Sequence, residues 1–223
     1  RHKKYCNDPK RDFSRKRKLP FELILKNIIG MGSKSITNEL IDIFQVSGEM
    51  PSASAFVQQR TKIKPEALKA VFDGFMDRML TSTDKMRILA VDGSDIKIQT
   101  NPKDETSHIS TSEDRKSFNL LHLNAMYDLE QHVYTDAIIQ GAKNQNEHEA
   151  LNEMVDRSEI PKALVIADRG YESYNDMAHI QEKGWFFLIR IKDGNNGIKM
   201  GLELPRENEF DFDVSLKLTR KQT

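Results

Sequence analysis

A run of five apolar residues, Ala163-Leu164-Val165-Ile166-Ala167, is followed at once by Asp168-Arg169-Gly170. Short apolar runs that end at turn residues are typical of strands buried on both faces of a sheet. A second run of this kind, Ile88-Leu89-Ala90-Val91, ends at Asp92-Gly93. The sequence therefore predicts two central strands, each closed by an aspartate.

Further elements surround these strands. Alternating or continuous apolar residues predict strands at 87–92, 118–127, 132–140, 163–167 and 185–191, and helical periodicity predicts helices at 147–158 and 174–183. The order strand-strand-strand-helix-strand-helix-strand is an antiparallel meander that leads into right-handed parallel crossovers. It predicts an α/β domain with a ribonuclease H-like mixed sheet over residues 85–223. Alternation at 209–218 predicts one more, half-buried strand outside this core order.

The first part of the chain has a different pattern. Apolar residues recur at helical spacing between Pro20 and about Leu80, which predicts an all-helical region over residues 19–84. Ser35, and either Ser52 or Ser54, stand where helix N-caps are expected. Helices at 35–45 and 52–61 fit a DNA-reading pair whose outward residues include Gln58, Gln59 and Arg60. A plain helical bundle is the alternative.

The charges are unevenly distributed, although the chain has 34 Lys plus Arg and 34 Asp plus Glu. Residues 1–18 hold nine Lys or Arg and two Asp, which gives this basic arm a charge of +7. Such an arm is suited to phosphate contacts with double-stranded DNA, most densely at Arg15, Lys16, Arg17 and Lys18. A solvated, disordered tail is the alternative.

Several protein classes are excluded by composition. The one cysteine, Cys6, cannot form an internal disulfide or a Cys-based zinc site. Apolar runs such as 185–189 are too short to span a bilayer, and no secretory h-region follows the first residues. We therefore expect a cytoplasmic protein. Because the chain begins at Arg1 and ends at Thr223 without a recognisable signal, we also expect a fragment.

Asp92 and Asp168 are the main candidates for chemistry. They are 76 residues apart in the sequence, but neighbouring first and fourth strands would bring both to one edge of the sheet. Two carboxylates brought together favour a bound cation, and hard oxygen ligands favour Mg²⁺ or Mn²⁺. A pair of such ions is a common device for phosphoryl transfer. The alternative is that both aspartates are ordinary turn residues.

Other polar residues give weaker signals. His122 and His132 fit hydrogen-bonded structural roles on strands, and neither a zinc site nor a Gly-rich phosphate loop is predicted. The helix at 147–158 carries glutamates that indicate a solvated face, although one could lean toward the acidic edge: Glu147, Glu149 and Glu153. Basic residues near that edge suit phosphate contacts: Lys97, Lys103, Arg115, Lys116 and Lys143.

These motifs resemble the DDE transposases of bacterial insertion sequences, specifically the insertion-sequence-four group. The most specific part is Ile166-Ala167-Asp168-Arg169-Gly170-Tyr171-Glu172-Ser173, supported by Val91-Asp92-Gly93-Ser94 and by residues 124–128 and 135–137. Residues 15–21 and 54–60 are similar to the family's N-terminal region. The resemblance implies that Asp92 and Asp168 are the first two catalytic acids and metal ligands. It also implies cleavage and strand transfer at element ends, and a homo-oligomer on DNA.

One part of the family pattern does not occur. The family's third acid lies in a downstream helix with the pattern Tyr, two spacers, Arg, three spacers, Glu, six spacers, Lys. No tyrosine follows Tyr174, and no later glutamate has Arg four residues before it. The resemblance therefore implies that the chain ends inside a β-rich insertion that starts at about residue 193, and that this fragment is inactive alone. A ribonuclease H-like nuclease and a non-catalytic DNA-binding remnant are the alternatives.

Overall fold

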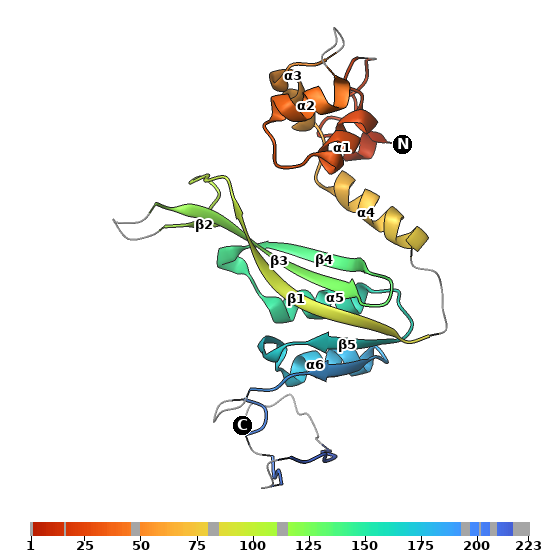
Figure 1. The fold of residues 1–223 in the computed structure, drawn as a ribbon, viewed down its shortest axis with the longest axis vertical. Coiled ribbons are helices and arrows are strands. Elements are labelled where there is room, and N and C mark those ends of the chain that lie inside the picture. The colour runs from red at the N-terminus through yellow and green to blue at the C-terminus, as the bar shows by residue number, and fades with distance from the viewer. Residues whose placement is uncertain are drawn as a thin grey trace. The chain divides into compact units, whose positions relative to one another are not determined.

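The computed structural model describes residues 2–15, 17–45, 50–79, 85–110, 116–192, 197–200, 202–205 and 209–215. The chain divides into two compact units, residues 1–81 and residues 82–223 (Figure 1). Among the described residues, no helix is long and apolar enough to cross a membrane.

The first unit is built from helices. A 3-10 helix at His2–Tyr5 is followed by α1 (Phe21–Gly30), α2 (Ile36–Phe44), α3 (Ala53–Arg60) and α4 (Glu66–Met79) (Figure 1). The side chains of Ser35 and Ser52 accept hydrogen bonds from the backbone N–H groups of Asn38 and Ala55. These contacts cap α2 and α3 at the serines that sequence reasoning placed there. The predicted helical N-terminal region is confirmed.

Residues 2–15 of the basic arm fold against these helices. Cys6 is fully buried and forms an antiparallel bridge with Ile63, and Phe13 packs on the apolar cluster around Phe56. The buried Asp12 accepts a hydrogen bond from the backbone N–H of Asp8 at 2.9 Å. The alternative of a disordered tail is therefore wrong for these residues, because the buried Cys6 and the partly buried Phe13 pack against the helical region. Their exposed cations are Lys4, Lys10, Arg11 and Arg15.

The second unit contains a mixed sheet. Its strands are β1 (Arg87–Ile98), β2 (His108–Ile109), β3 (Phe118–Asp128), β4 (Val133–Gly141), β5 (Ala163–Ala167) and β6 (Phe186–Ile189). β3 pairs antiparallel with β1, β2 and β4, whereas β5 is parallel to β1 and β6 is parallel to β5. The spatial order β4-β3-β1-β5-β6 and these directions are those of the predicted ribonuclease H-like sheet.

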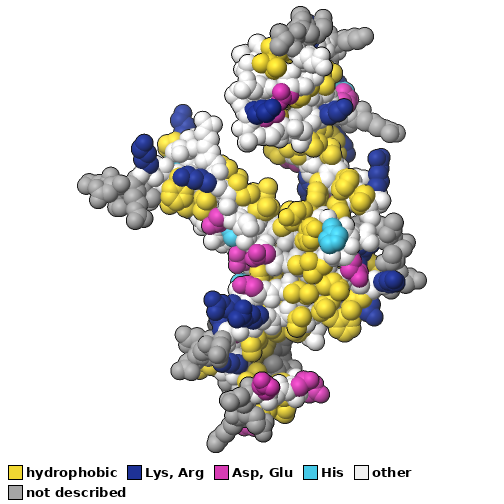
Figure 2. Space-filling model, viewed as in Figure 1, with side chains coloured by type: hydrophobic (Ala, Val, Ile, Leu, Met, Phe, Trp, Pro, Cys, Tyr) yellow, Lys and Arg dark blue, Asp and Glu magenta, His cyan; other side chains and the backbone are white. Residues whose placement is uncertain are grey.

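Two helices, α5 (Glu147–Arg157) and α6 (Tyr174–Glu182), cover one face of this sheet (Figure 1). The core beneath them combines Leu89 and Val91 of β1 with Val165 of β5 and with Leu151 of α5. On the other face, apolar residues are more than half exposed among the described residues: Tyr134, Ile139, Phe186 and Leu188. Figure 2 shows a broad apolar area over the second unit.

Two strand predictions need correction. β1 does not end at Asp92 but continues to Ile98, because β3 pairs along its length from Leu89 opposite Asp128 to Ile98 opposite Asn119. The strand predicted at 209–218 is not formed in residues 209–215, and residues 216–218 lie outside the described part of the chain. Phe210 and Phe212 are about half exposed at 48% and 53%, since no neighbouring strand pairs with this segment in the described residues.

Candidate active site

Asp92 and Asp168 lie side by side in the sheet. The parallel pairing of β1 with β5 ends with Val91 opposite Ala167, and the next residue in each segment is one of the two aspartates. Both aspartates are exposed. Thus the structure brings the two predicted acids to one edge, at the carboxyl end of β5 and at the point where β1 leaves it.

Backbone N–H groups orient both carboxylates. Asp92 Oδ1 accepts a hydrogen bond from Gly93 N at 2.9 Å, and Asp168 Oδ1 accepts one from Gly170 N at 2.7 Å. Asp168 thereby caps the 3-10 turn at Arg169–Tyr171. A Cβ atom on Gly170 would lie 2.8 Å from Asp168 Oδ1, too close for a real side chain. The Asp-Arg-Gly segment therefore holds its acid in one orientation.

Glu147 lies at the same edge. Its Oε2 atom is 3.6 Å from the position that a Cβ atom on Gly170 would take, and Asp168 Oδ1 is within 2.8 Å of that position. Sequence reasoning assigned the helix glutamates to a solvated face, which holds for the exposed Glu149 and Glu153 but not for half-buried Glu147. The missed signal was its spacing, because Glu147 stands one helical turn before the buried Leu151.

His122 contacts Glu147 on its other side and also contacts Asp95. The Glu147 Oε1 atom is 3.0 Å from His122 Nε2, and the opposite ring nitrogen, Nδ1, is 2.8 Å from Asp95 Oδ1. His122 is thus hydrogen-bonded, as predicted, but its partners are acids of the candidate site rather than of the core. Sequence reasoning did not single out Asp95.

The side chain of Tyr171, which follows Gly170, is buried. Tyr171 is 1% exposed, and its hydroxyl has no hydrogen-bond partner among the described residues. Burial raises the pKa of this hydroxyl, and the negative charges of Glu147, Asp92 and Asp168 raise it further. The phenol of Tyr171 is therefore neutral and has an unused hydrogen.

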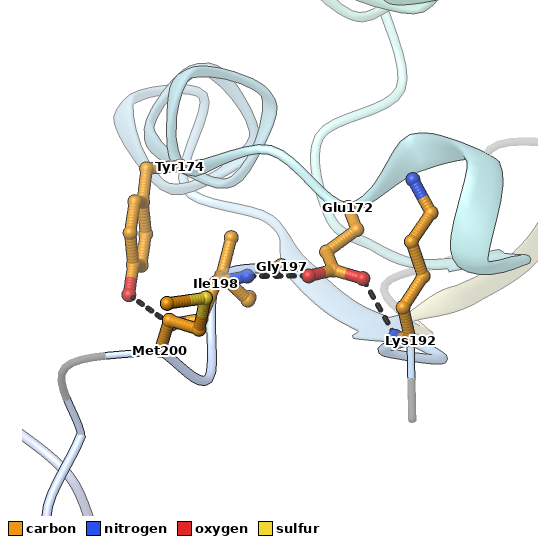
Figure 3. A pocket seen from close by; sticks show the side chains of 6 residues that line it. All are labelled: Glu172, Tyr174, Lys192, Gly197, Ile198 and Met200. Carbon is orange, nitrogen blue, oxygen red and sulfur yellow. Dashed lines mark hydrogen bonds between the residues drawn. The ribbon is translucent and has the colours of Figure 1, made fainter. Parts of the chain in front are cut away.

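Glu172 has a different role. Its carboxylate accepts hydrogen bonds from the backbone N–H groups of Lys192 and Ile198, and Tyr174 donates to the Ile198 carbonyl at 2.9 Å (Figure 3). The two backbone hydrogen bonds lower the pKa of Glu172. These residues line a pocket of about 370 Å³ with Gly197 and Met200. Both Glu172 oxygens are therefore occupied in holding the chain after β6.

The predicted DNA-binding residues lie in the first unit. Arg15 and Arg17 of the arm and Gln59 of α3 line one pocket of about 300 Å³, together with Arg11 and Lys62. Lys18, Gln58 and Arg60 are exposed, and Lys16 lies outside the described residues. Of the predicted edge cations, four are exposed, namely Lys97, Lys103, Lys116 and Lys143, and Arg115 lies outside the described residues. The structure thus joins the arm to α3 around one basic pocket.

Comparison with known families identifies the class of protein. Residues 83–215, more than half of the chain, match the family described as "Transposase DDE domain". The chain belongs to this family, which confirms the coarse resemblance drawn from its motifs. No protein of curated function matches the sequence.

Solved transposase structures show weak similarity. A piggyBac transposase synaptic complex with hairpin DNA shares 9% identity over 84% of this chain and 44% of that chain, with a TM-score of 0.48. A Drosophila P element transposase strand transfer complex shares 10% over 80% and 43%, with a TM-score of 0.37. A Mos1 transposase paired-end complex shares 14% over 78% and 60%, with a TM-score of 0.28. The chain spans less than two thirds of each.

Proposed function

We propose that this chain is part of a transposase of the insertion-sequence-four group, which cleaves DNA at the ends of its element and transfers the cut strands. The observation that carries this proposal is the pair Asp92 and Asp168, adjacent on parallel strands of a DDE-family sheet. Residues 85–223 form the catalytic domain, and residues 1–18 and 19–84 form the basic arm and helical region that bind DNA. The protein acts as a homo-oligomer on double-stranded DNA.

The donor atoms of the site fit a hard divalent cation. Asp92 and Asp168 offer only carboxylate oxygens, the ligands that Mg²⁺ and Mn²⁺ prefer, and their like charges are relieved by a cation. When bound, such an ion supplies Lewis acidity and lowers the pKa of a bound water or hydroxyl. The N–H groups of Gly93 and Gly170 hold the two carboxylates in orientation.

Two aspartates alone do not complete the site. Among the described residues, no three His, Cys, Asp or Glu side chains stand together at metal-ligand spacing. The family's downstream Tyr-Arg-Glu-Lys helix has no counterpart within residues 1–223. We therefore place the third catalytic acid outside this chain, and we expect the chain alone to be inactive.

DNA cleavage tests the proposal. A protein extended through the downstream helix should nick labelled element ends in the presence of Mn²⁺, and residues 1–223 alone should not. Asp92→Asn and Asp168→Asn in the extended protein should each lower the cleavage rate by at least about a hundredfold, because misplacement of reacting groups has effects of this size. Glu182→Gln, an exposed change on α6, is the matched control. Cleavage that survives both aspartate changes would contradict the proposal.

The salt dependence of DNA binding tests the role of the first unit. Replacing Arg15 and Arg17 with Gln should lower the log-log slope of affinity against salt by about 0.9 for each phosphate that the arm no longer neutralises. Arg78→Gln removes the same kind of charge from an exposed site on α4 and should leave the slope unchanged. Alanine at Gln58, Gln59 or Arg60 should instead reduce the preference for element ends over random DNA.

A further inference from the structure

Three polar side chains form a continuous chain of contacts from the sheet to α5. Asp95 on β1 lies opposite His122 on β3 in the antiparallel register, and His122 reaches across to Glu147 at the start of α5. The distances are 2.8 Å from Asp95 Oδ1 to His122 Nδ1 and 3.0 Å from His122 Nε2 to Glu147 Oε1. The His122 side chain is 7% exposed, whereas the side chains of Asp95 and Glu147 are 55% and 36% exposed.

These contacts engage only one of the two carboxylate oxygens of Glu147. Each of the two ring nitrogens of His122 contacts one carboxylate oxygen, so the ring links Asp95 to Glu147. This fixes Glu147 Oε1, while Oε2 points toward Gly170 and Asp168. Hydrogen bonds to an ionised carboxylate are about twice as strong as neutral ones, which makes His122 an effective anchor.

The backbone next to Asp92 makes room for this arrangement. A Cβ atom on Gly93 would collide with Glu147 Oε1 and would lie 2.6 Å from His122 Nε2. Glycine at this position therefore lets α5 bring its acidic end against β1, one residue beyond the first aspartate. At Gly170, two residues beyond the second aspartate, Glu147 Oε2 is 3.6 Å from the position of a Cβ atom, which is an ordinary contact distance.

A separate observation marks the space between these acids as a site. The buried Tyr171 hydroxyl has no hydrogen-bond partner in the described residues and lies in the combined field of Glu147, Asp92 and Asp168. A buried polar group without a partner costs free energy and indicates a missing ligand, water or ion. The Tyr171 hydroxyl therefore keeps a hydrogen that it can donate to a ligand or water near these acids.

We propose that Glu147 is a third acidic residue of the Asp92–Asp168 site, where it adds affinity for a divalent cation, and that His122, anchored by Asp95, is its positioning residue. This inference rests on the proposed function and deepens it. The carboxylates are gathered at one edge without a preformed ligand set in the described residues. Glu147 therefore acts first through its charge, because each added carboxylate strengthens the attraction for a cation over a few ångströms. It is additional to the downstream acid of the family.

Binding of Mn²⁺ to the chain of 223 residues tests the role of Glu147. Free Mn²⁺ is measured by electron paramagnetic resonance during titration of the wild type, Glu147→Gln and Glu149→Gln. Glu147→Gln should weaken affinity about tenfold, within the range known for residues that tune metal sites. Glu149→Gln removes the same charge from an exposed position on the same helix and should stay within about twofold of the wild type. Equal affinities for all three proteins would overturn the inference.

Three variants test the positioning role. His122→Leu should weaken Mn²⁺ binding as much as Glu147→Gln, and His122→Gln, which keeps a donor for Glu147, should restore part of the affinity. Combining His122→Leu with Glu147→Gln should add little further loss, since both act through one carboxylate. Changes at the buried His122 could unfold the protein. Asp95→Asn is then the alternative variant, because the Asp95 side chain is 55% exposed and its replacement does not disturb the core. It too should weaken binding, and unchanged affinity would show that His122 is only structural.

The outcomes separate the two proposals. If Asp92→Asn and Asp168→Asn abolish Mn²⁺ binding but Glu147→Gln does not weaken it, the inference is wrong and the proposed function stands. If neither aspartate change affects binding, or if the wild type binds no Mn²⁺, the metal site of the proposed function is wrong and the inference falls with it.

Discussion

Glu147 precedes Asp168 in the sequence and Glu172 follows it, and the hydrogen bonds of these two glutamates differ. Glu172 accepts backbone hydrogen bonds on both of its oxygens, which ties down the segment after β6. Glu147 is held by His122 on one oxygen, and its other oxygen faces Asp168. A carboxylate whose hydrogen bonds are all supplied by the protein is structural, whereas one that is fixed on a single side is oriented and still available to a ligand.

Asp128 sets the extreme of this comparison, and its loss should have the largest effect on stability. It is fully buried, accepts from the Arg87 side chain at 2.7 Å, and also accepts from the backbone N–H groups of Glu130 and Gln131. Asp128→Asn should lower the free energy of unfolding by about 3 to 5 kcal/mol, because it breaks a buried ion pair. Urea unfolding of the wild type and the variant measures this, and a change within about 0.5 kcal/mol would be typical of an exposed residue instead.

The same residue predicts how stability depends on pH. Burial alone would raise the pKa of Asp128, but hydrogen bonds from Gln131, Arg87 and Glu130 outweigh it and lower the pKa below its usual value. The pKa of an aspartate in the unfolded chain is about 3.9. Because the pKa of Asp128 is lower in the folded protein, its contribution to stability is fully present above about pH 3.9 and is lost as the pH falls through its folded-state pKa. Asp128→Asn should therefore flatten the loss of stability in acid. If Asp128→Asn lost stability at low pH as steeply as the wild type does, the lowered pKa of Asp128 would be contradicted.

Gly93→Ala tests the close approach at Glu147 and should have the next largest effect. The added methyl group would collide with Glu147 and His122, so we expect a loss of about 1 to 3 kcal/mol in the free energy of unfolding, together with weaker Mn²⁺ binding. Gly74→Ala on α4, where no atom lies within 4 Å, is the matched control and should stabilise its helix by about 0.5 to 1 kcal/mol. Equal effects at the two glycines would show that Gly93 is not a packing constraint.

Glu172→Gln should give the smallest and most local effect. Because the lowered pKa of Glu172 comes from its hydrogen bonds to the Lys192 and Ile198 backbone, removal of the charge weakens those bonds. Amide hydrogen exchange at Lys192 and Ile198 should become faster, while the midpoint of thermal unfolding and the Mn²⁺ affinity stay unchanged. Loss of Mn²⁺ binding in this variant would place Glu172 in the site and reverse the comparison.

Sequence reasoning predicted the sheet order and the meeting of the two aspartates because both depend on local patterns. The apolar runs before Asp92 and Asp168 are each continuous, and the alternation of helices and strands after β4 restricts their connection to right-handed crossovers. The helices of the first unit were predicted for the same reason, since Ser35 and Ser52 act as local N-caps.

Features that depend on distant partners were missed. The length of β1 depends on β3, the folding of the basic arm depends on the bridge between Cys6 and Ile63, and residues 209–215 lack a pairing strand in the described structure. The placement of Glu147 depends on His122, which is 25 residues away in the sequence. Each of these contacts joins segments that only the fold brings together. The spacing of Glu147 from Leu151 indicates which face of the helix it occupies, but it does not indicate its partner His122.

Asp92 and Asp168 are proposed to form one site for a divalent cation, and this central claim is tested most directly by one Mn²⁺ titration series. The series uses the chain of 223 residues with Asp92→Asn, Asp168→Asn and, as the matched carboxylate control, Glu172→Gln. We predict that either aspartate change abolishes the Mn²⁺ binding seen in the wild type, whereas Glu172→Gln binds as the wild type does. Retention of wild-type affinity by either aspartate variant would contradict the claim.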